Sequence, residues 1–256
     1  MSADLHAAAW LVDGADLVVP GVSLTHDGSG LYVGTPGAPL VSTPPGLDGG
    51  IDLGGAFPPY TRSIMYTVRA AGFDAVWAQV RALRRRCKPD RAVSLTQVVP
   101  DPEGADTNIS LSTTAHLQGD PRVDWLGANA ADVDLDWLIT GGPFYGPSTN
   151  IANAAGTTSV KGDVRTRKMT LTLAAGAART VTNTTNGFWF TFGTTVPTGG
   201  VLVDVLARTA KAITGGTDLS RYLSWGKVHP FQLEAGSNTI TVSAGSASID
   251  YQPAYL

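Results

Sequence analysis

The feature that most constrains this chain is an alternation of apolar and polar residues with a period of two. The stretches RSIMYTVR (62–69), VDLDWLI (133–139), KMTLTL (168–173) and FWFTF (188–192) all follow it. Successive side chains of a β-strand point to opposite faces, so each stretch is expected to form an antiparallel strand with one buried and one wet face. Charged residues make up only 15% of the chain, below the roughly 25% of typical soluble domains. The sequence therefore predicts a mainly β protein.

One segment, FDAVWAQVRALRRR (73–86), has a helical period instead. Gly72 precedes it and Pro89 follows it, and both residue types mark helix ends. A helix of this length is marginal alone in water, so its apolar face must pack against a sheet or a neighbour. The residues expected on that face are Phe73, Val76, Trp77, Val80 and Leu83.

The chain is long enough for two domains, and the Gly- and Pro-rich stretch GGPFYGPSTN (141–150) is a plausible boundary. We therefore expect a strand-rich domain with one helix over 1–145 and a second domain over 146–256. In the second domain, strands recur at intervals of about 8 to 15 residues between Gly, Ser and Asn turns, which is typical of a β-sandwich or jelly roll. The closing stretch ASIDYQPAYL (247–256) is then a member of a sheet.

The charge balance excludes some classes of protein. The formal net charge is −3, so no overall basic field favours nucleic acid as the main partner. No apolar run approaches the ~20 residues of a membrane helix. The N-terminus carries Asp4, Asp13 and Asp16 and does not resemble a signal peptide. We expect synthesis in the cytoplasm and no membrane insertion.

The single cysteine, Cys87, excludes an internal disulfide and any metal site made of cysteines alone. Its neighbours Arg84, Arg85, Arg86 and Lys88 can lower the pKa of a thiol. The simpler interpretation is an incidental thiol near the end of a helix.

The aspartates Asp132, Asp134 and Asp136 are the main candidates for chemistry. Neighbouring members lie about 7 Å apart by strand rise, so they could share a calcium ion or act as an acid and base pair. Calcium loops need a tight turn with carbonyl ligands, whereas this stretch is extended, so a solvated strand face is the preferred interpretation. Only two glutamates are present, and there is no zinc spacing, phosphate-binding loop or G-x-S-x-G turn. We expect no catalytic residue, no metal and no cofactor.

Positive charge is concentrated in one place, since six of the eighteen Lys and Arg residues lie between positions 81 and 91. One interpretation is the solvated side of the amphipathic helix. The other is an electrostatic contact with an acidic partner surface or a neighbouring subunit, with Arg81, Arg84 and Arg85 as the candidate interface residues.

Two tryptophans are candidates for a carbohydrate platform. Trp189 falls on the opposite face from the phenylalanines of its strand, and Trp225 lies beside a glycine. The alternative for both is burial under a loop.

A resemblance to a known family rests on four stretches. PFQLEAGSNTITV (230–242), followed by IDYQPAYL (249–256), resembles the ends of the distal tail proteins of long-tailed siphophages, often labelled minor tail proteins. VLVDVLARTA (201–210) and WLGANAADVDLDW (125–137), which runs into GGPFYG, are similar to the same family. The likeness spans most of the chain, and its ending is the most specific piece.

The resemblance implies an N-terminal β-sandwich with a helix that forms a ring, typically of six copies. It also implies a galectin-like C-terminal jelly-roll β-sandwich that decorates the outside of the ring. Such a ring lies at the tail tip of the virion and joins the tail tube to the baseplate hub. The implied partners are other copies of the chain, the tail tube protein, the hub or tail-associated protein and other minor tail proteins. The family has no catalytic motif to transfer.

Three functions are therefore weighed: a tail-tip ring subunit, a carbohydrate-binding module that adheres to the host surface, and a glycoside hydrolase or esterase that uses the aspartates. We favour the first, since low charge and abundant Thr and Val suit flat faces and strand edges that pair with neighbouring copies. The stretch AAAWLVDGADLVV (7–19) is expected to form a strand and to reach an adjacent subunit.

Overall fold

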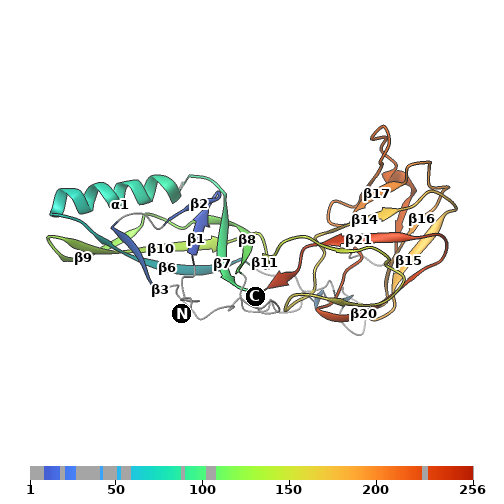
Figure 1. The fold of residues 1–256 in the computed structure, drawn as a ribbon, viewed down its shortest axis with the longest axis horizontal. Helices are drawn as coiled ribbons and strands as arrows, with labels where there is room; N and C mark the ends of the chain where they lie inside the picture. Colours follow the sequence, from blue (N-terminus) through green and yellow to red (C-terminus); the bar gives the residue numbers. More distant parts are fainter. Residues whose placement is uncertain are drawn as a thin grey trace, which may run out of the picture. The chain divides into compact units, whose positions relative to one another are not determined.

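The computed structural model forms two compact units, each described here by itself. The first unit lies within residues 1–38 and 56–145, and the second lies within 39–55 and 146–255. Among the described residues, strands dominate and α1 is the one α-helix (Figure 1). The prediction of a mainly β chain with one amphipathic helix is confirmed. The structure describes residues 9–17, 21–26, 41–42, 51–52, 59–87, 90–101, 108–226 and 230–255.

The first unit is built on one antiparallel sheet. Its strand order is β2-β1-β7-β8-β10-β6-β3, with β9 paired to β10 and β11 paired to β8. The strands are β1 (Ala9–Val12), β2 (Ala15–Asp16), β3 (Val22–His26), β6 (Tyr60–Arg69), β7 (Val93–Pro100), β8 (Asn108–Leu117), β9 (Arg122–Gly127), β10 (Ala130–Ile139) and β11 (Phe144–Tyr145).

The long strands β6 and β10 pair over their whole length and carry the predicted alternation. The positions predicted to be apolar are fully buried, and the aspartates of β10 lie on the opposite face. Both predicted strands are therefore confirmed. The buried members are Ile64, Tyr66, Val68, Val133, Leu135, Trp137 and Ile139.

Arg62 shares the buried face of β6, and the sequence pattern did not predict this position. Its side chain is only 5% exposed. The guanidinium carbon lies 4.7 Å from the centre of the Trp10 ring and 5.7 Å from that of Phe144. Aromatic rings attract a cation over their faces, which accounts for a guanidinium in an apolar interior.

Helix α1 (Phe73–Cys87) runs along the buried face of β6 and β10 (Figure 1). It begins after Gly72, whose φ of +97° is a backbone conformation that residues other than glycine rarely adopt. The predicted helix over 73–86 is confirmed to within one residue. The side chains that α1 buries are Val76, Val80, Leu83 and Cys87.

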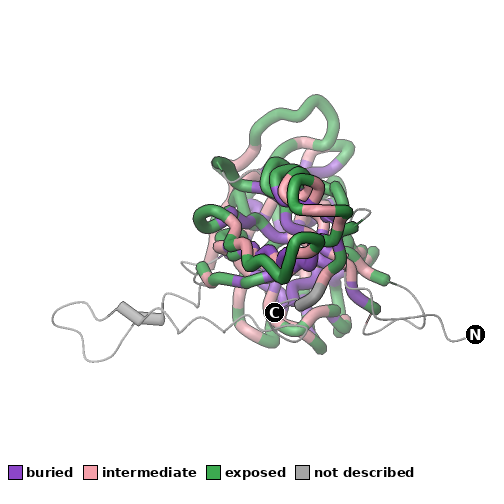
Figure 2. The backbone as a smooth tube through the Cα atoms, turned by 90° about the vertical axis from the view of Figure 1, so that its left-hand side faces the viewer, coloured by how far each residue is buried: buried purple, intermediate pink, exposed green. Residues whose placement is uncertain are grey.

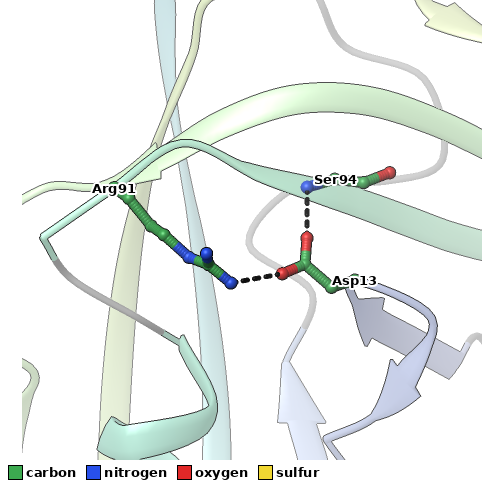
Figure 3. Close-up of polar contacts among 3 residues, drawn as sticks. All are labelled: Asp13, Arg91 and Ser94. Carbon is green, nitrogen blue, oxygen red and sulfur yellow. Dashed lines mark hydrogen bonds and ion pairs between the residues drawn. The ribbon is translucent and has the colours of Figure 1, made fainter.

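The N-terminal strands β1 and β2 form a hairpin whose two turn residues, Asp13 and Gly14, have φ of +49° and +79°. This is the Asp-Gly turn that matches the twist of a hairpin. The Asp13 carboxylate fixes the turn on β7 (Figure 3): its Oδ1 accepts a hydrogen bond from the Ser94 amide at 2.9 Å, and its Oδ2 lies 3.4 Å from Nη2 of Arg91. The strand expected within 7–19 therefore exists, and β1 pairs with β7 of its own chain.

The second unit contains two five-stranded antiparallel sheets. One has the order β12-β21-β14-β17-β18, and its strands are β12 (Thr149–Ile151), β21 (Ala247–Tyr251), β14 (Met169–Leu173), β17 (Val201–Asp204) and β18 (Thr209–Ala212). The other has the order β13-β20-β15-β16-β19, and its strands are β13 (Gly156–Val160), β20 (Gly236–Val242), β15 (Arg179–Asn183), β16 (Phe188–Phe192) and β19 (Leu223–Trp225). Short elements are β4 (Val41–Ser42), β5 (Ile51–Asp52), the 3₁₀ turn η1 (Ser220–Tyr222) and β22 (Ala254–Tyr255).

The apolar faces of these two sheets meet in one core. Figure 2 colours the described residues of the whole chain by burial, with exposed positions along the outer loops and buried positions within. Two sheets that share a core in this way make a β-sandwich, so that prediction is confirmed. Strand β21 lies between β12 and β14, which explains the strong patterning near the end of the chain. Core residues from the first sheet include Leu171, Val203 and Ile249, and those from the second include Val181, Phe190 and Ile240.

Candidate subunit interface on the helix side of the first unit

The predicted interface residues Arg81, Arg84 and Arg85 lie on the exposed side of α1, and Arg84 and Arg85 belong to its last turn. Positive charge there is favoured by the helix dipole. Nη2 of Arg84 lies 2.6 Å from Oδ1 of Asp120, and the guanidinium carbon of Arg81 lies 5.2 Å from the centre of the Trp77 ring. The same helix thus buries one side in the first unit and presents arginines on the other.

All three arginines border one groove between α1 and the start of β9, with a volume of about 490 Å³. We call it the helix groove. Three of its lining residues are basic and one is acidic, and the remaining four are apolar, so it suits a partner that is both acidic and partly apolar. The lining residues are Trp77, Val80, Arg81, Arg84, Arg85, Asp120, Pro121 and Val123.

Next to the helix groove lies an aromatic cluster formed by Phe73, Trp77 and Trp125. The rings of Phe73 and Trp125 stack at 4.3 Å with an interplanar angle of 22°, and the Trp77 ring lies 6.2 Å from that of Trp125. Phe73 is 52% exposed and Trp125 is 38% exposed. Phe73 was expected on the packed face of the helix. Its ring stacks instead on the ring of Trp125, because β9 runs beside the N-terminal part of α1.

The cluster and the groove share Trp77 and so form one continuous surface. Exposed aromatic side chains beside arginines are the composition that carries most of the binding energy in protein interfaces. The sequence analysis did not select Trp125 or its neighbour Leu126, which is also exposed. The available signal was a tryptophan in the short strand 122–127, which has few apolar neighbours to bury it.

The aspartate face, formed by Asp132, Asp134 and Asp136 of β10, lies on the side of the sheet opposite α1. Oδ1 of Asp132 accepts a hydrogen bond from Oγ1 of Thr67 at 2.7 Å, and Oδ1 of Asp136 accepts one from Oγ of Ser63. Both hydroxyls belong to the facing residues of β6. Among the described residues, no group of three or more His, Cys, Asp or Glu is placed to hold a metal ion. These contacts tie two strands together.

The candidate carbohydrate residues Trp189 and Trp225 lie on opposite faces of their sheet. Trp225 pairs in register with Phe190, and their rings are 5.3 Å apart on the core side. Trp189 is 37% exposed on the outer side. Gly226 lies against the Trp189 ring so closely that a Cβ atom there would come within 2.0 Å of Cε2. The structure thus does not bring the two rings together, and Trp189 is the more exposed of the two.

The stretch that most resembled the distal tail proteins holds a buried amide network. The side chains of Asn183, Gln232 and Asn238 are almost completely buried. Nδ2 of Asn183 donates to Oδ1 of Asn238 at 2.8 Å, and the Gln232 carbonyl accepts from both Asn183 and Asn186. Oδ1 of Asn238 also accepts from the Glu234 amide at 3.0 Å. The network joins the segment before β20 to the turn after β15, so its role is structural.

Cys87 is the last residue of α1 and is completely buried. Burial raises the pKa of its thiol to about 12, and the nearby Arg86 lowers it only in part. The sequence left open that neighbouring basic residues lower this pKa. Burial outweighs them, because removing a thiolate from water costs more than one exposed arginine returns.

Within the part of the chain that the structure describes, no helix has the length and apolar character needed to cross a membrane.

Comparison with known proteins agrees with the architecture. No protein-family model and no curated protein matches the sequence. Among solved structures, the chain has the fold of a phage distal tail protein. That structure is the Dit protein (gp 19.1) of phage SPP1, described as a paradigm of the hub adsorption apparatus in phages that infect Gram-positive bacteria. The TM-score is 0.67 at 16% identity, and the match covers 98% of this chain and 100% of that one.

Two baseplate structures are also similar, with lower scores. They are the phage p2 baseplate in its activated conformation with Sr, at a TM-score of 0.44 and 12% identity, and the same conformation with Ca, at 0.45 and 10%. They cover 96% of this chain and 98% and 97% of theirs. The assignment of the fold rests on the SPP1 protein alone.

Proposed function

We propose that this chain is a structural protein of a long-tailed phage virion. It forms a ring at the distal end of the tail and connects the tail tube to the baseplate hub and tail tip. The observation that carries the proposal is the fold shared with SPP1 Dit over 98% of the chain. The copy number of six follows from the resemblance to the distal tail family.

In this proposal the two units have different tasks. The first unit forms the ring through surfaces such as the helix groove and the aromatic cluster. The second unit, galectin-like by resemblance, decorates the outside. The partners are other copies of the chain, the tail tube protein, the hub or tail-associated protein and other minor tail proteins. The protein is made in the host cytoplasm, is incorporated into the tail tip of the virion and catalyses no reaction.

The surface chemistry of the first unit supports an assembling protein. Phe73, Trp125 and Leu126 are large apolar side chains at the surface, and a solitary soluble protein gains nothing from keeping them in water. They lie beside three arginines, which interfaces also favour. An interface that covers the cluster would bury this apolar area and exclude water from the ion pairs beside it.

Negative-stain electron microscopy of the purified protein tests this function. We expect closed rings of uniform size, and we expect the rings to stack on the end of tubes when the tail tube protein is added. Particles of single-chain size at every concentration, with and without the tube and hub proteins, would contradict the proposal.

The carbohydrate-binding alternative rests on Trp189 alone, because Trp225 packs toward the core. A glycan array probed with assembled rings tests it, and an array without hits removes it. The hydrolase alternative is tested by hydrolysis of glycoside and ester substrates with the wild type and with the double variant Asp134→Asn, Asp136→Asn. No hydrolysis by the wild type, or an equal rate in the double variant, removes it.

A further inference from the structure

We propose that the helix groove of one copy binds the aspartate face of the next copy, so that the ring is joined head to tail by opposite charges. This inference rests on the proposed function and names the partner of that surface. The two surfaces meet three requirements: opposite charge, matching spacing and placement on opposite sides of one unit.

The charges are complementary. The helix groove has three arginines against one aspartate, and that aspartate, Asp120, already engages Arg84. Arg85 makes no ion pair within the described residues, and Arg81 contacts the Trp77 ring. The aspartate face presents three carboxylates in a row. Arg122 lies opposite Asp134 in the strand register and pairs with Asp124 at 3.1 Å, and Arg69 lies opposite Ala130. The four aspartates on this face therefore outnumber its two arginines, and an excess of negative charge remains.

The spacing of the charges also matches. Arg81 and Arg85 are four positions apart on a helix, which places them about 6 Å apart along its axis. Alternate residues of a strand, such as Asp134 and Asp136, are about 7 Å apart. Two arginines can therefore face two successive carboxylates when the helix of one copy lies along β10 of the next.

The aspartates are already oriented. Hydrogen bonds from Thr67 and Ser63 engage one oxygen of Asp132 and one oxygen of Asp136. A side chain that is held before binding loses less rotational freedom when a partner arrives. The hydrogen bonds therefore favour an ion pair across the interface.

The placement makes the contact intermolecular. Helix α1 covers the buried face of β6 and β10 (Figure 1). The aspartates alternate with the buried residues of β10 and therefore lie on the opposite face. One copy cannot join its own two surfaces, since the sheet lies between them. A contact between two different patches is heterologous, and it produces a ring when the rotation between copies closes.

Charge reversal with mixing tests the proposal. One variant carries Arg81→Glu and Arg85→Glu, and the other carries Asp134→Lys and Asp136→Lys. Each variant alone brings like charges together, so we expect each to need at least about tenfold more protein to assemble than the wild type in sedimentation velocity. The mixture at equal amounts restores both kinds of contact, so we expect rings in which the two variants alternate.

The matched control carries Arg208→Glu and Lys211→Glu, which change the charge by the same amount at exposed positions of the second unit. It should assemble like the wild type. Assembly of each charge-reversed variant at wild-type concentrations, or failure of the mixture when circular dichroism shows both variants folded, overturns the head-to-tail contact but leaves a ring function standing. A wild type that never assembles overturns both.

If a variant does not fold, two neutral pairs replace it. They are Arg81→Gln with Arg85→Gln and Asp134→Asn with Asp136→Asn. Each pair must then weaken assembly, and equal assembly to the wild type overturns the contact.

Discussion

Cys87 illustrates how burial outweighs a neighbouring charge in setting the pKa of a side chain in this protein. Its pKa is raised to about 12, and burial also raises the pKa of the Tyr66 hydroxyl in the same interior. For both acids the folded state holds the proton more tightly than the unfolded chain. Their contribution to stability is therefore complete below the unfolded pKa of a thiol, about 8.5, and is lost as the pH rises toward the folded values.

We predict that Cys87 does not react with a thiol reagent such as dithionitrobenzoate in the native protein at pH 8. Reaction should become rapid in guanidinium chloride, because the exposed thiol recovers its ordinary pKa. Absorbance at 412 nm follows the released thiolate. Full labelling within seconds in native buffer would show that the end of α1 is open to solvent.

A second prediction for a single residue concerns Asn238, which lies in the buried amide network. Its side chain accepts from Asn183 and from the Glu234 amide, and it donates to the Glu234 carbonyl. Asn238→Ala removes these three hydrogen bonds from a largely buried network, so the free energy of unfolding should fall by about 2 to 4 kcal/mol. Urea denaturation measures the change. The control is Asn150→Ala, which removes an exposed hydrogen bond to Asp250 and should cost less than about 1 kcal/mol.

At the scale of the element, the two sides of α1 have different roles: the buried side stabilises the fold, and the arginine side is proposed to serve assembly. Its buried side chains hold it on the sheet, whereas the Arg84–Asp120 pair is largely exposed. Exposed ion pairs contribute about 0 to 1 kcal/mol. The arginine side of the helix is therefore free to serve a partner.

We predict that Arg84→Glu with Arg85→Glu weakens ring assembly while the free energy of unfolding changes by less than about 1 kcal/mol. Negative-stain imaging measures the first effect and thermal unfolding the second. Leu83→Ala is the contrasting control, since it removes a buried side chain and should cost about 2 to 4 kcal/mol. Rings that form as in the wild type would remove α1 from the interface.

The elements that the sequence predicted best were those whose apolar residues recur with a regular period. The strands FWFTF (188–192) and VDLDWLI (133–139) and the helix over 73–86 all follow local patterns that one buried face requires. The stacking of Phe73 on Trp125 at the surface could not be predicted from the sequence. It depends on where β9 runs beside α1, which is a tertiary relation that no local pattern encodes.

The candidate site was predicted in the same uneven way. Arg81, Arg84 and Arg85 were found from local charge density, and the structure brings them to one groove. Trp225 was selected because it adjoins a glycine, but the register of β19 on β16 turns its ring toward Phe190. Such orientations depend on the pairing register between strands that are distant in the chain, and this register cannot be predicted from local sequence patterns.

For the whole molecule, each of the two units should hold together on its own. The core of the second unit is contributed by both of its sheets. We predict that a fragment of residues 146–256 unfolds in a single cooperative thermal transition, followed by circular dichroism. Leu171→Asp places a charge in that core and should abolish the transition. A fragment that shows no transition would mean that the second unit depends on the rest of the chain.

The account depends most on the claim that this chain acts by assembling with copies of itself. Native mass spectrometry of the purified protein, alone and with the tail tube protein, measures this directly. The account predicts one discrete closed species of about six chain masses. A mass of 26.6 kDa, the single chain, under every condition would contradict it.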